Sequence, residues 1–205
     1  MIHVIDCGTG NVQSVLNALQ RINIVWKCAR CVSDLDGVER VILPGVGHYD
    51  EAMQRFNKSG MRETLDVLVK NENISVLGIC VGMQMMAEGS DEGCIPGLNW
   101  IPGRVRAFAG NPKIGSLALP HMGWNDIQSV SNSPLITNYF QESAEFYFLH
   151  SYYFDSENRN DVKATAHYGF DFDALVSRGR IHGTQFHPEK SHRWGIELLR
   201  NFARS

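Results

Sequence analysis

A cysteine between two glycines is the residue of this sequence best suited to nucleophilic chemistry. Residues 76–86 read VLGICVGMQMM, with Cys80 two residues from Gly78 and from Gly82. An apolar, strand-like run ends at the cysteine and a helix-like run follows it, which is the cysteine version of the nucleophile elbow. Glycines at these two positions remove side chains that would collide with adjacent backbone in the tight turn, and the turn lifts the sulfur clear of the sheet edge. Taken alone, the motif is equally compatible with a buried structural cysteine between packing glycines.

The backbone after the cysteine favours reactivity at the same point. A helix that begins at Val81 aims its first unpaired N–H groups at the turn. Such groups favour a thiolate, and they can hold an oxyanion formed by attack at a carbonyl. We therefore expect a thiol nucleophile at the carboxyl end of a strand, where open α/β sheets place their sites.

The best candidate base lies about a hundred residues further along the chain. Residues 184–189 read TQFHPE, so that His187 and Glu189 stand two positions apart. In an extended segment such residues point the same way, and Pro188 favours that form for the residue before it. The carboxylate can then accept a hydrogen bond from one ring nitrogen and leave the other for Cys80. The alternative is a surface histidine beside a helix-capping acid.

A third element is the sequence LPGVG at residues 43–47, where another strand ends. Its two glycines leave the backbone free to offer an N–H group to a ligand oxygen, although an ordinary strand-to-helix turn would look the same. Three such elements at strand ends together predict a cysteine hydrolase or acyl-transfer site.

Short apolar runs that alternate with longer amphipathic segments must position these residues. In the first half we expect strands at 2–5, 24–29, 40–43 and 74–79, and helices at 11–22, 48–56, 61–70 and 81–88. After about residue 97 we expect strands at 104–108, 118–122, 146–154, 162–167, 174–178 and 181–186, a hairpin turn at 177–180 and a closing helix at 194–203. The pattern predicts one α/β domain over residues 1–205, with a doubly wound, mostly parallel sheet, helices on both faces and a more antiparallel second half.

Length and composition fit a single enzyme-sized domain. The chain has 205 residues, 43% of them hydrophobic and 20% charged, with a net charge of −3 and interleaved signs. No basic patch suggests nucleic acid or a membrane as a partner, and no apolar run reaches the roughly 18 residues of a membrane helix. The opening MIHVIDCGTGN is too short for a signal-peptide core, so we expect a cytoplasmic protein.

The other thiols and the histidines give no sign of a metal or cofactor. An odd count of five cysteines without an export signal favours reduced thiols. Cys28 and Cys31 have redox-motif spacing, but no second pair or nearby histidine accompanies them, so we interpret the spacing as chance. The eight histidines are scattered without ligand spacing. We expect neither a metal nor a cofactor.

The motifs GICVGMQ, PGVG and QFHPEKS together resemble those of the class I, or triad, glutamine amidotransferases, whose fold is flavodoxin-like. Within that family, GMQ, PHMGWN at 120–125 and FLHSYY at 148–153 are similar to the glutaminase subunits of imidazole glycerol phosphate synthases. The resemblance extends from Ile5 to Phe202. It implies that Cys80 attacks the side-chain amide of L-glutamine, that His187 moves the protons and that Glu189 orients His187. The other residues it implies are oxyanion donors at Val81, Val46 and Gly47, and glutamine contacts at Gly45, Gly47, Gln84, Ser151 and Tyr152.

The resemblance also implies a partner. Family members of this kind form a heterodimer with a (β/α)₈ cyclase subunit, which receives the ammonia through an internal channel and closes the imidazole ring in histidine biosynthesis. The lone subunit is expected to be nearly idle. The implied interface residues are His121, Met122, Trp124 and Asn125. A tryptophan packed in the chain's own core is the alternative for Trp124, and a packing or interface role is expected for His150.

Three residues depart from the family pattern. They bear on the identity of the partner more than on the hydrolysis of glutamine. Cys7 stands where a tyrosine is typical, and Gln13 and Ala118 stand where basic residues are expected. Related subunits supply ammonia for amidino or amino groups on surface sugars, so that role is an alternative. A non-catalytic docking subunit and a free peptidase or hydrolase on the same fold are the others.

Overall fold

The computed structural model describes residues 1–137 and 144–205. Its first half alternates strands and helices as the sequence predicts. The elements are β1 (Ile2–Ile5), α1 (Val12–Arg21), β2 (Trp26–Ala29), the 3₁₀ helix η1 (Val32–Leu35), β3 (Arg40–Gly45), α2 (Tyr49–Lys58), α3 (Met61–Lys70), β4 (Ser75–Cys80) and α4 (Val81–Gln84).

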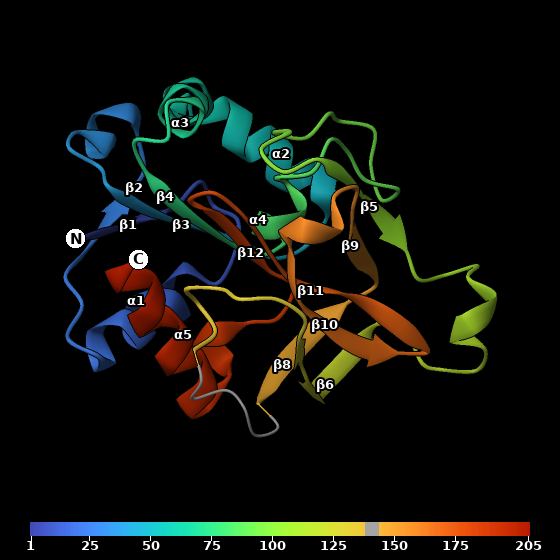
Figure 1. The fold of residues 1–205 in the computed structure, drawn as a ribbon. Helices are drawn as coiled ribbons and strands as arrows, with labels where there is room; N and C mark the ends of the chain where they lie inside the picture. Colours follow the sequence, from blue (N-terminus) through green and yellow to red (C-terminus); the bar gives the residue numbers. More distant parts are fainter. Residues whose placement is uncertain (138–143) are drawn as a thin grey trace.

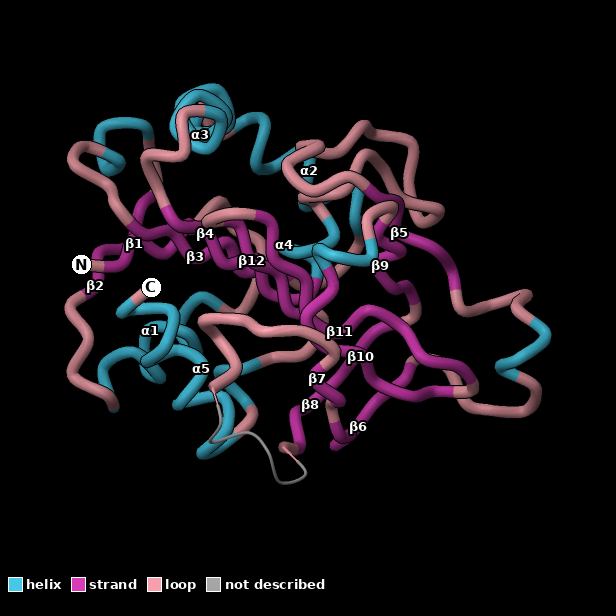
Figure 2. The backbone as a smooth tube through the Cα atoms, viewed as in Figure 1, coloured by secondary structure: helices cyan, strands magenta, loops and turns pink. Residues whose placement is uncertain are grey.

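The second half is mostly strands. The strands are β5 (Gly103–Ala107), β6 (His121–Asp126), β7 (Gln128–Ser129), β8 (Glu145–His150), β9 (Tyr152–Ser156), β10 (Val162–Tyr168), β11 (Phe170–Arg178) and β12 (Ile181–Thr184). The helices are the 3₁₀ turns η2 (Pro112–Ile114), η4 (Arg159–Asp161) and η5 (Pro188–Lys190), and the closing helix α5 (His192–Arg204). Strands and loops dominate this half in Figure 2.

The main sheet confirms the predicted α/β architecture. Its strand order is β2-β1-β3-β4-β12-β11-β10-β7, with β5 joined through β9. The strands from β2 to β12 pair in parallel, and β11, β10 and β7 continue antiparallel. Helices α2 and α3 cover one face of the parallel part, and α1 and α5 cover the other (Figure 1). The sheet is therefore doubly wound in its first half and more antiparallel in its second.

The register of the central strands brings distant segments to one edge. Gly45 at the end of β3 lies opposite Cys80 at the end of β4, and Thr184 at the end of β12 lies opposite Ile79. Because these three strands are neighbours and run the same way, the segments that follow them meet at the same edge of the sheet.

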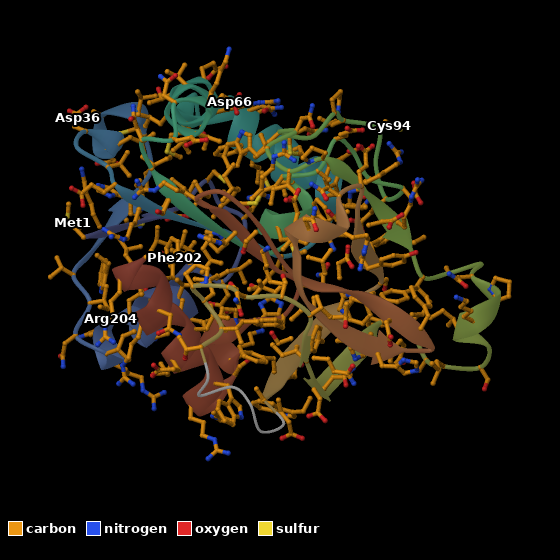
Figure 3. All side chains as sticks on the ribbon, in the orientation of Figure 1. Met1, Asp36, Asp66, Cys94, Phe202 and Arg204 are labelled. Atoms are coloured by element: carbon orange, nitrogen blue, oxygen red, sulfur yellow. The ribbon has the colours of Figure 1, made fainter. Side chains whose placement is uncertain are left out.

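Amphipathic helices close the core over this sheet. Asn11 caps α1 by accepting a hydrogen bond from the Ser14 N–H group. Strands β1 and β4 are buried at every position, as expected of parallel strands covered on both faces. On α5, the buried ring of Phe202 packs into the core while Arg204 is exposed (Figure 3).

Several predicted boundaries are wrong. Strand β11 begins at Phe170 and not at residue 174, and β12 ends at Thr184 and not at residue 186. The strand expected at 146–154 breaks at Ser151, because β8 pairs with β6 in a separate two-stranded sheet whereas β9 pairs with β5 and β11. The helix expected at 81–88 ends at Gln84. The strand expected at 118–122 begins at His121, directly after Pro120, which lacks the N–H group that a strand ladder uses.

Candidate active site

Cys80 occupies a strained turn at the end of β4. Its φ of 55° and ψ of −111° are unusual for a residue with a side chain, and such strain is concentrated at functional sites. The collisions expected from the sequence are present. A Cβ on Gly82 would lie 1.9 Å from the Leu43 carbonyl oxygen, and one on Gly78 would lie 2.7 Å from the Gly82 carbonyl oxygen. Close approach of β3 and α4 to the turn therefore requires glycine on both sides of the cysteine.

The side chain of Cys80 is buried. The residue is 4% exposed. Its Sγ atom lies 3.8 Å from the Leu149 carbonyl oxygen and 3.7 Å from Nε2 of Gln185, and its side chain is near enough to His187 to raise the pKa of that ring. Leu149, near the end of β8, is the residue that contacts the sulfur from above the turn. The thiol is reached through a cavity and not from open solvent.

His187 and Glu189 form a buried pair beside this thiol. Nδ1 of His187 lies 2.9 Å from Oε1 of Glu189, and both side chains are 2% exposed. His187 is extended, with φ −100° and ψ 93°, but Pro188–Lys190 forms the 3₁₀ turn η5. The contact therefore arises from a turn and not from the extended segment that the sequence predicts. Because a carboxylate only accepts, Nδ1 donates to it, and Nε2 is the nitrogen left for Cys80.

These two partners determine the protonation of His187. Burial by itself would lower its pKa, but the hydrogen bonds and charges of Cys80 and Glu189 outweigh burial and raise the pKa to about 10. The ring therefore carries its proton at neutral pH, next to the sulfur. An imidazolium in this position can donate a proton to a leaving group.

A cavity of about 250 Å³ opens over the sulfur. It is lined by Val46, Gly47, Cys80, Val81, Gln84, Glu92, Pro120, Leu149, His150, Ser151, Tyr152, His187 and Lys190. All three predicted oxyanion residues are in this lining, and so are four of the five predicted glutamine contacts. The exception is Gly45, which packs on the elbow in β3, where a Cβ would lie 2.4 Å from the Gly82 nitrogen.

The shortness of helix α4 limits how far its dipole can stabilise negative charge at the turn. Helix α4 has only four residues, Val81–Gln84. A macrodipole grows with the number of aligned peptide units, so a single turn offers mainly its local N–H groups. Any oxyanion stabilisation here therefore comes from individual backbone donors.

Several residues around the sulfur escaped the sequence analysis. Glu92 lines the cavity from a loop and accepts a hydrogen bond from the Tyr49 N–H group at 2.9 Å. No sequence pattern around Glu92 predicts that it lies at the site. Lys190 also lines the cavity, and Gln185 contacts the sulfur. Both lie inside the QFHPEKS motif, so their closeness to His187 in the sequence could have predicted that they lie at the site.

The predicted interface strand β6 divides into an inner and an outer face. The His121 side chain faces the interior: the residue is 4% exposed, and its Nδ1 atom lies 3.0 Å from Nε2 of His150. Its assignment to the interface stays a prediction. Met122 and Trp124 are 66% and 46% exposed. Trp124 stacks on the His192 ring at 5.0 Å, at the surface and not in the core. Asn125 is half-buried and donates to the His167 carbonyl at 2.9 Å.

The part of the chain that the structure describes offers no metal site. There, no group of three or more His, Cys, Asp or Glu side chains could hold a metal ion. Within residues 1–137 and 144–205 no helix is long and apolar enough to cross a membrane. All five cysteines are free, and Cys28 and Cys31 hydrogen-bond to the carboxylates of Asp6 and Asp34 instead of to each other.

Comparisons with known proteins agree with this geometry. The family model for glutamine amidotransferase class-I matches residues 3–205. A protein of Bdellovibrio bacteriovorus named imidazole glycerol phosphate synthase subunit HisH is 49% identical over 203 residues, covering 99% of each chain. A Pseudomonas aeruginosa protein named imidazole glycerol phosphate synthase subunit HisH 2 is 40% identical, covering 98% of each chain.

Solved structures share the fold. A crystal structure of a glutamine amidotransferase superposes with a TM-score of 0.75 at 20% identity, covering 99% of this chain and 97% of that one. The structure of PurLQS from Thermotoga maritima superposes with a TM-score of 0.76 at 17% identity and the same coverage.

Proposed function

The chain belongs to the class I glutamine amidotransferase family, and from that premise we propose that it is the glutaminase subunit of an imidazole glycerol phosphate synthase. In this role it hydrolyses L-glutamine to glutamate and ammonia for use in histidine biosynthesis. The observation that carries the chemistry is the buried Cys80–His187–Glu189 constellation at the base of the cavity. We infer a cytoplasmic location from the same role.

The first half-reaction forms a thioester. The Cys80 sulfur attacks the side-chain carbonyl carbon of glutamine, and the negative charge moves to the carbonyl oxygen. Backbone N–H groups of Val81 and of the Val46–Gly47 segment, which line the cavity, are the candidate donors to that oxygen. The tetrahedral intermediate collapses when His187 donates its proton to the departing amide nitrogen, which leaves as ammonia.

The second half-reaction restores the enzyme. His187 is now neutral and takes a proton from water, which attacks the glutamyl thioester. Collapse of this intermediate breaks the carbon–sulfur bond and releases glutamate. Glu189 supports both steps because its bond to Nδ1 keeps Nε2 directed at the reacting atoms.

The outer face of β6 supports the partner part of the proposal. Met122 pairs with Leu149, and Leu149 and Val46 are exposed and line the cavity. Trp124 is exposed two residues further along the same face of β6. Exposed aromatic and apolar groups of this kind form the centres of protein interfaces. We propose that a (β/α)₈ cyclase subunit docks here and receives the ammonia.

One experiment tests the activity and separates the alternatives. Glutamate release and imidazole glycerol phosphate formation are measured for the chain alone, for its complex with the cyclase, and for a Cys80→Ala complex supplied with glutamine or with ammonia. We expect glutamine turnover only in the complex, and ammonia-driven product formation that survives the substitution. Glutamine-driven activity in the Cys80→Ala complex would refute the catalytic proposal.

The remaining outcomes identify the rivals. Full glutamine turnover by the lone chain would indicate a free hydrolase. Product formation from ammonia but never from glutamine would indicate a docking subunit. Glutamine turnover in a complex that forms no imidazole glycerol phosphate would favour the sugar-modifying role.

A further inference from the structure

Gln185 contacts the reacting sulfur, and neither the motif analysis nor the mechanism above gives it a role. It lies between the end of β12 and His187 and is fully buried. Its Nε2 atom lies 3.7 Å from Sγ of Cys80. Its Oε1 atom lies 3.1 Å from Nε2 of Gln84. Both ends of this amide therefore have a specific partner at the bottom of the cavity.

The neighbouring amide fixes which end of Gln185 faces the sulfur. Nε2 of Gln84 also lies 3.2 Å from the Tyr152 carbonyl oxygen, which can only accept. Gln84 must therefore present its amino group to Tyr152, and the second N–H of that group points to Gln185. Since Gln185 meets it with Oε1, the N–H side of Gln185 faces Cys80.

Two buried histidines continue this chain of hydrogen bonds beyond the Tyr152 carbonyl. The Tyr152 carbonyl also faces Nδ1 of His150 at 2.8 Å, and Nε2 of His150 faces Nδ1 of His121 at 3.0 Å. Burial lowers the pKa of His150 to about 3 and that of His121 to about 4, so both rings are neutral at neutral pH. His150 must then donate to Tyr152, His121 must donate to His150, and Nε2 of His121 accepts from Asn125 at 3.2 Å.

On the histidine side, Asn125, His121 and His150 therefore each donate to the next group in the direction of the Tyr152 carbonyl. On the other side, Gln84 donates to Tyr152 and to Gln185. Reversing the Gln185 amide would place two amide N–H groups against each other and an oxygen against the sulfur. An unsatisfied buried donor is costly, so the reversed state is disfavoured.

We propose that Gln185 is a catalytic residue of the glutaminase site, whose side-chain N–H donates to the Cys80 sulfur and stabilises its thiolate form. A hydrogen bond to a charged acceptor is stronger than one to a neutral acceptor, so this donor favours the thiolate over the thiol. The bond also holds the sulfur at the base of the cavity. The proposal rests on the proposed function of Cys80 but can be tested without glutamine or a partner.

The test is the pH dependence of Cys80 alkylation by iodoacetamide in the full-length chain, resolved from the other cysteines by mass spectrometry. The variants are Gln185→Leu, which removes the donor, and Gln185→Glu, which places carboxylate oxygen against the sulfur. The matched control is Thr184→Val. Thr184 is the preceding residue, is equally buried and donates to the Phe186 carbonyl at 3.1 Å, away from the sulfur. The titratable groups facing the sulfur or lining its cavity are His187 with Glu189, His150, Tyr152, Glu92 and Lys190, and all remain in every variant.

We expect the rate of Cys80 alkylation at neutral pH to fall about fivefold or more in Gln185→Leu, because one buried hydrogen bond is lost. The rate should fall further in Gln185→Glu, because a carboxylate then faces the sulfur. The pH of half-maximal alkylation should rise in both and stay unchanged in Thr184→Val. In the complex with the cyclase, kcat for glutamine should fall while KM stays within about twofold, because Gln185 contacts the sulfur and not the cavity.

Other outcomes overturn the proposal. Wild-type alkylation profiles in both folded variants would show that the amide does not act on the sulfur. An equal shift in Thr184→Val would show that general loosening of the segment is responsible. Gln185→Met, which keeps the length of the side chain, replaces the leucine variant if circular dichroism shows that the latter is unfolded. A complex without glutaminase activity would contradict the proposed function, whereas the alkylation profiles would still decide the role of Gln185.

Discussion

Replacing Glu189 by glutamine removes a charge from the site while keeping its shape. The carboxylate accepts the Nδ1–H of His187 at 2.9 Å inside the protein, where both side chains are 2% exposed. Its other oxygen, Oε2, is buried without a hydrogen-bond partner among the described residues. In Glu189→Gln, the new amide either accepts from Nδ1 or, reversed, donates to it and forces the wrong tautomer of the ring.

The pKa of His187 gives the size of the expected effect. A rise from 6.5 to about 10 corresponds to on the order of 5 kcal/mol in favour of the imidazolium, contributed by Cys80 and Glu189 together against burial. Loss of one hydrogen bond to a charged group costs roughly 1.5–3 kcal/mol, or about 10- to 100-fold in a step that needs the correctly oriented ring, and the wrong tautomer adds to this loss. We expect kcat for glutamine to fall by about 100-fold or more, with KM changed only a few-fold, since Glu189 does not line the cavity.

The assay is glutamate release by the complex across a range of pH, with ammonia-driven product formation as the control for assembly. The same substitution should also alter stability. A raised pKa means that the stability contributed by His187 is present below pH 6.5 and is lost as pH rises towards about 10. Thermal melts of Glu189→Gln should show a weaker loss over that range. A glutamine-driven kcat within threefold of wild type would refute the role assigned to Glu189.

Three further substitutions probe the turn and the core. Gly82→Ala would place a Cβ 1.9 Å from the Leu43 carbonyl oxygen, so we expect a loss of at least about 2 kcal/mol in urea unfolding together with loss of glutaminase activity; unchanged stability would contradict the packing of the elbow. His3 is buried with both ring nitrogens unpartnered among the described residues, so His3→Val should raise the melting temperature by the equivalent of about 1 kcal/mol, and a lower one would indicate a hidden partner. Burial lowers the pKa of His182 to about 4, so up to about 3 kcal/mol of stability should disappear as pH falls from 6.5 towards 4, and His182→Gln should flatten that part of the melting curve; an equally steep variant would refute the assignment.

The sequence was sufficient to predict that Cys80, His187 and Glu189 lie together. Cys80 ends one apolar strand and His187 follows another, and parallel strands deliver such residues to one edge of the sheet. The sequence could not show that β12 pairs directly with β4, because strand order is a long-range property. It indicated the His187–Glu189 contact but not the 3₁₀ turn that makes it.

Boundaries failed where distant segments compete for backbone groups. The periodicity after Val81 continues towards Glu88, yet the Met85 and Met86 carbonyls accept hydrogen bonds from Leu98 and Trp100, which ends α4 early. Strand β8 ends at His150 because the next residues pair with a different sheet. The local sequence shows neither the residues that bond the Met85 and Met86 carbonyls nor the strands that pair with β9.

The burial of His121 was within reach of the sequence. In a strand that begins at His121, alternation places His121 and Asn125 on one face and Met122 and Trp124 on the other. The predicted strand, 118–122, ended before Trp124 and Asn125, so it did not include the residues whose alternation separates the two faces. Glu92, by contrast, lies in a loop with no periodic pattern, and only the fold brings it to the cavity.

The central claim is that glutamine is hydrolysed through a covalent bond to Cys80. The most direct measurement incubates the complex with glutamine, quenches it in acid and locates any glutamyl adduct by mass spectrometry of the cysteine-containing peptides. We predict a glutamyl thioester on the peptide that contains Cys80, which hydroxylamine releases and which is absent in Cys80→Ala. Steady glutamate release with no adduct on that peptide, or with the adduct on another cysteine, would contradict the account.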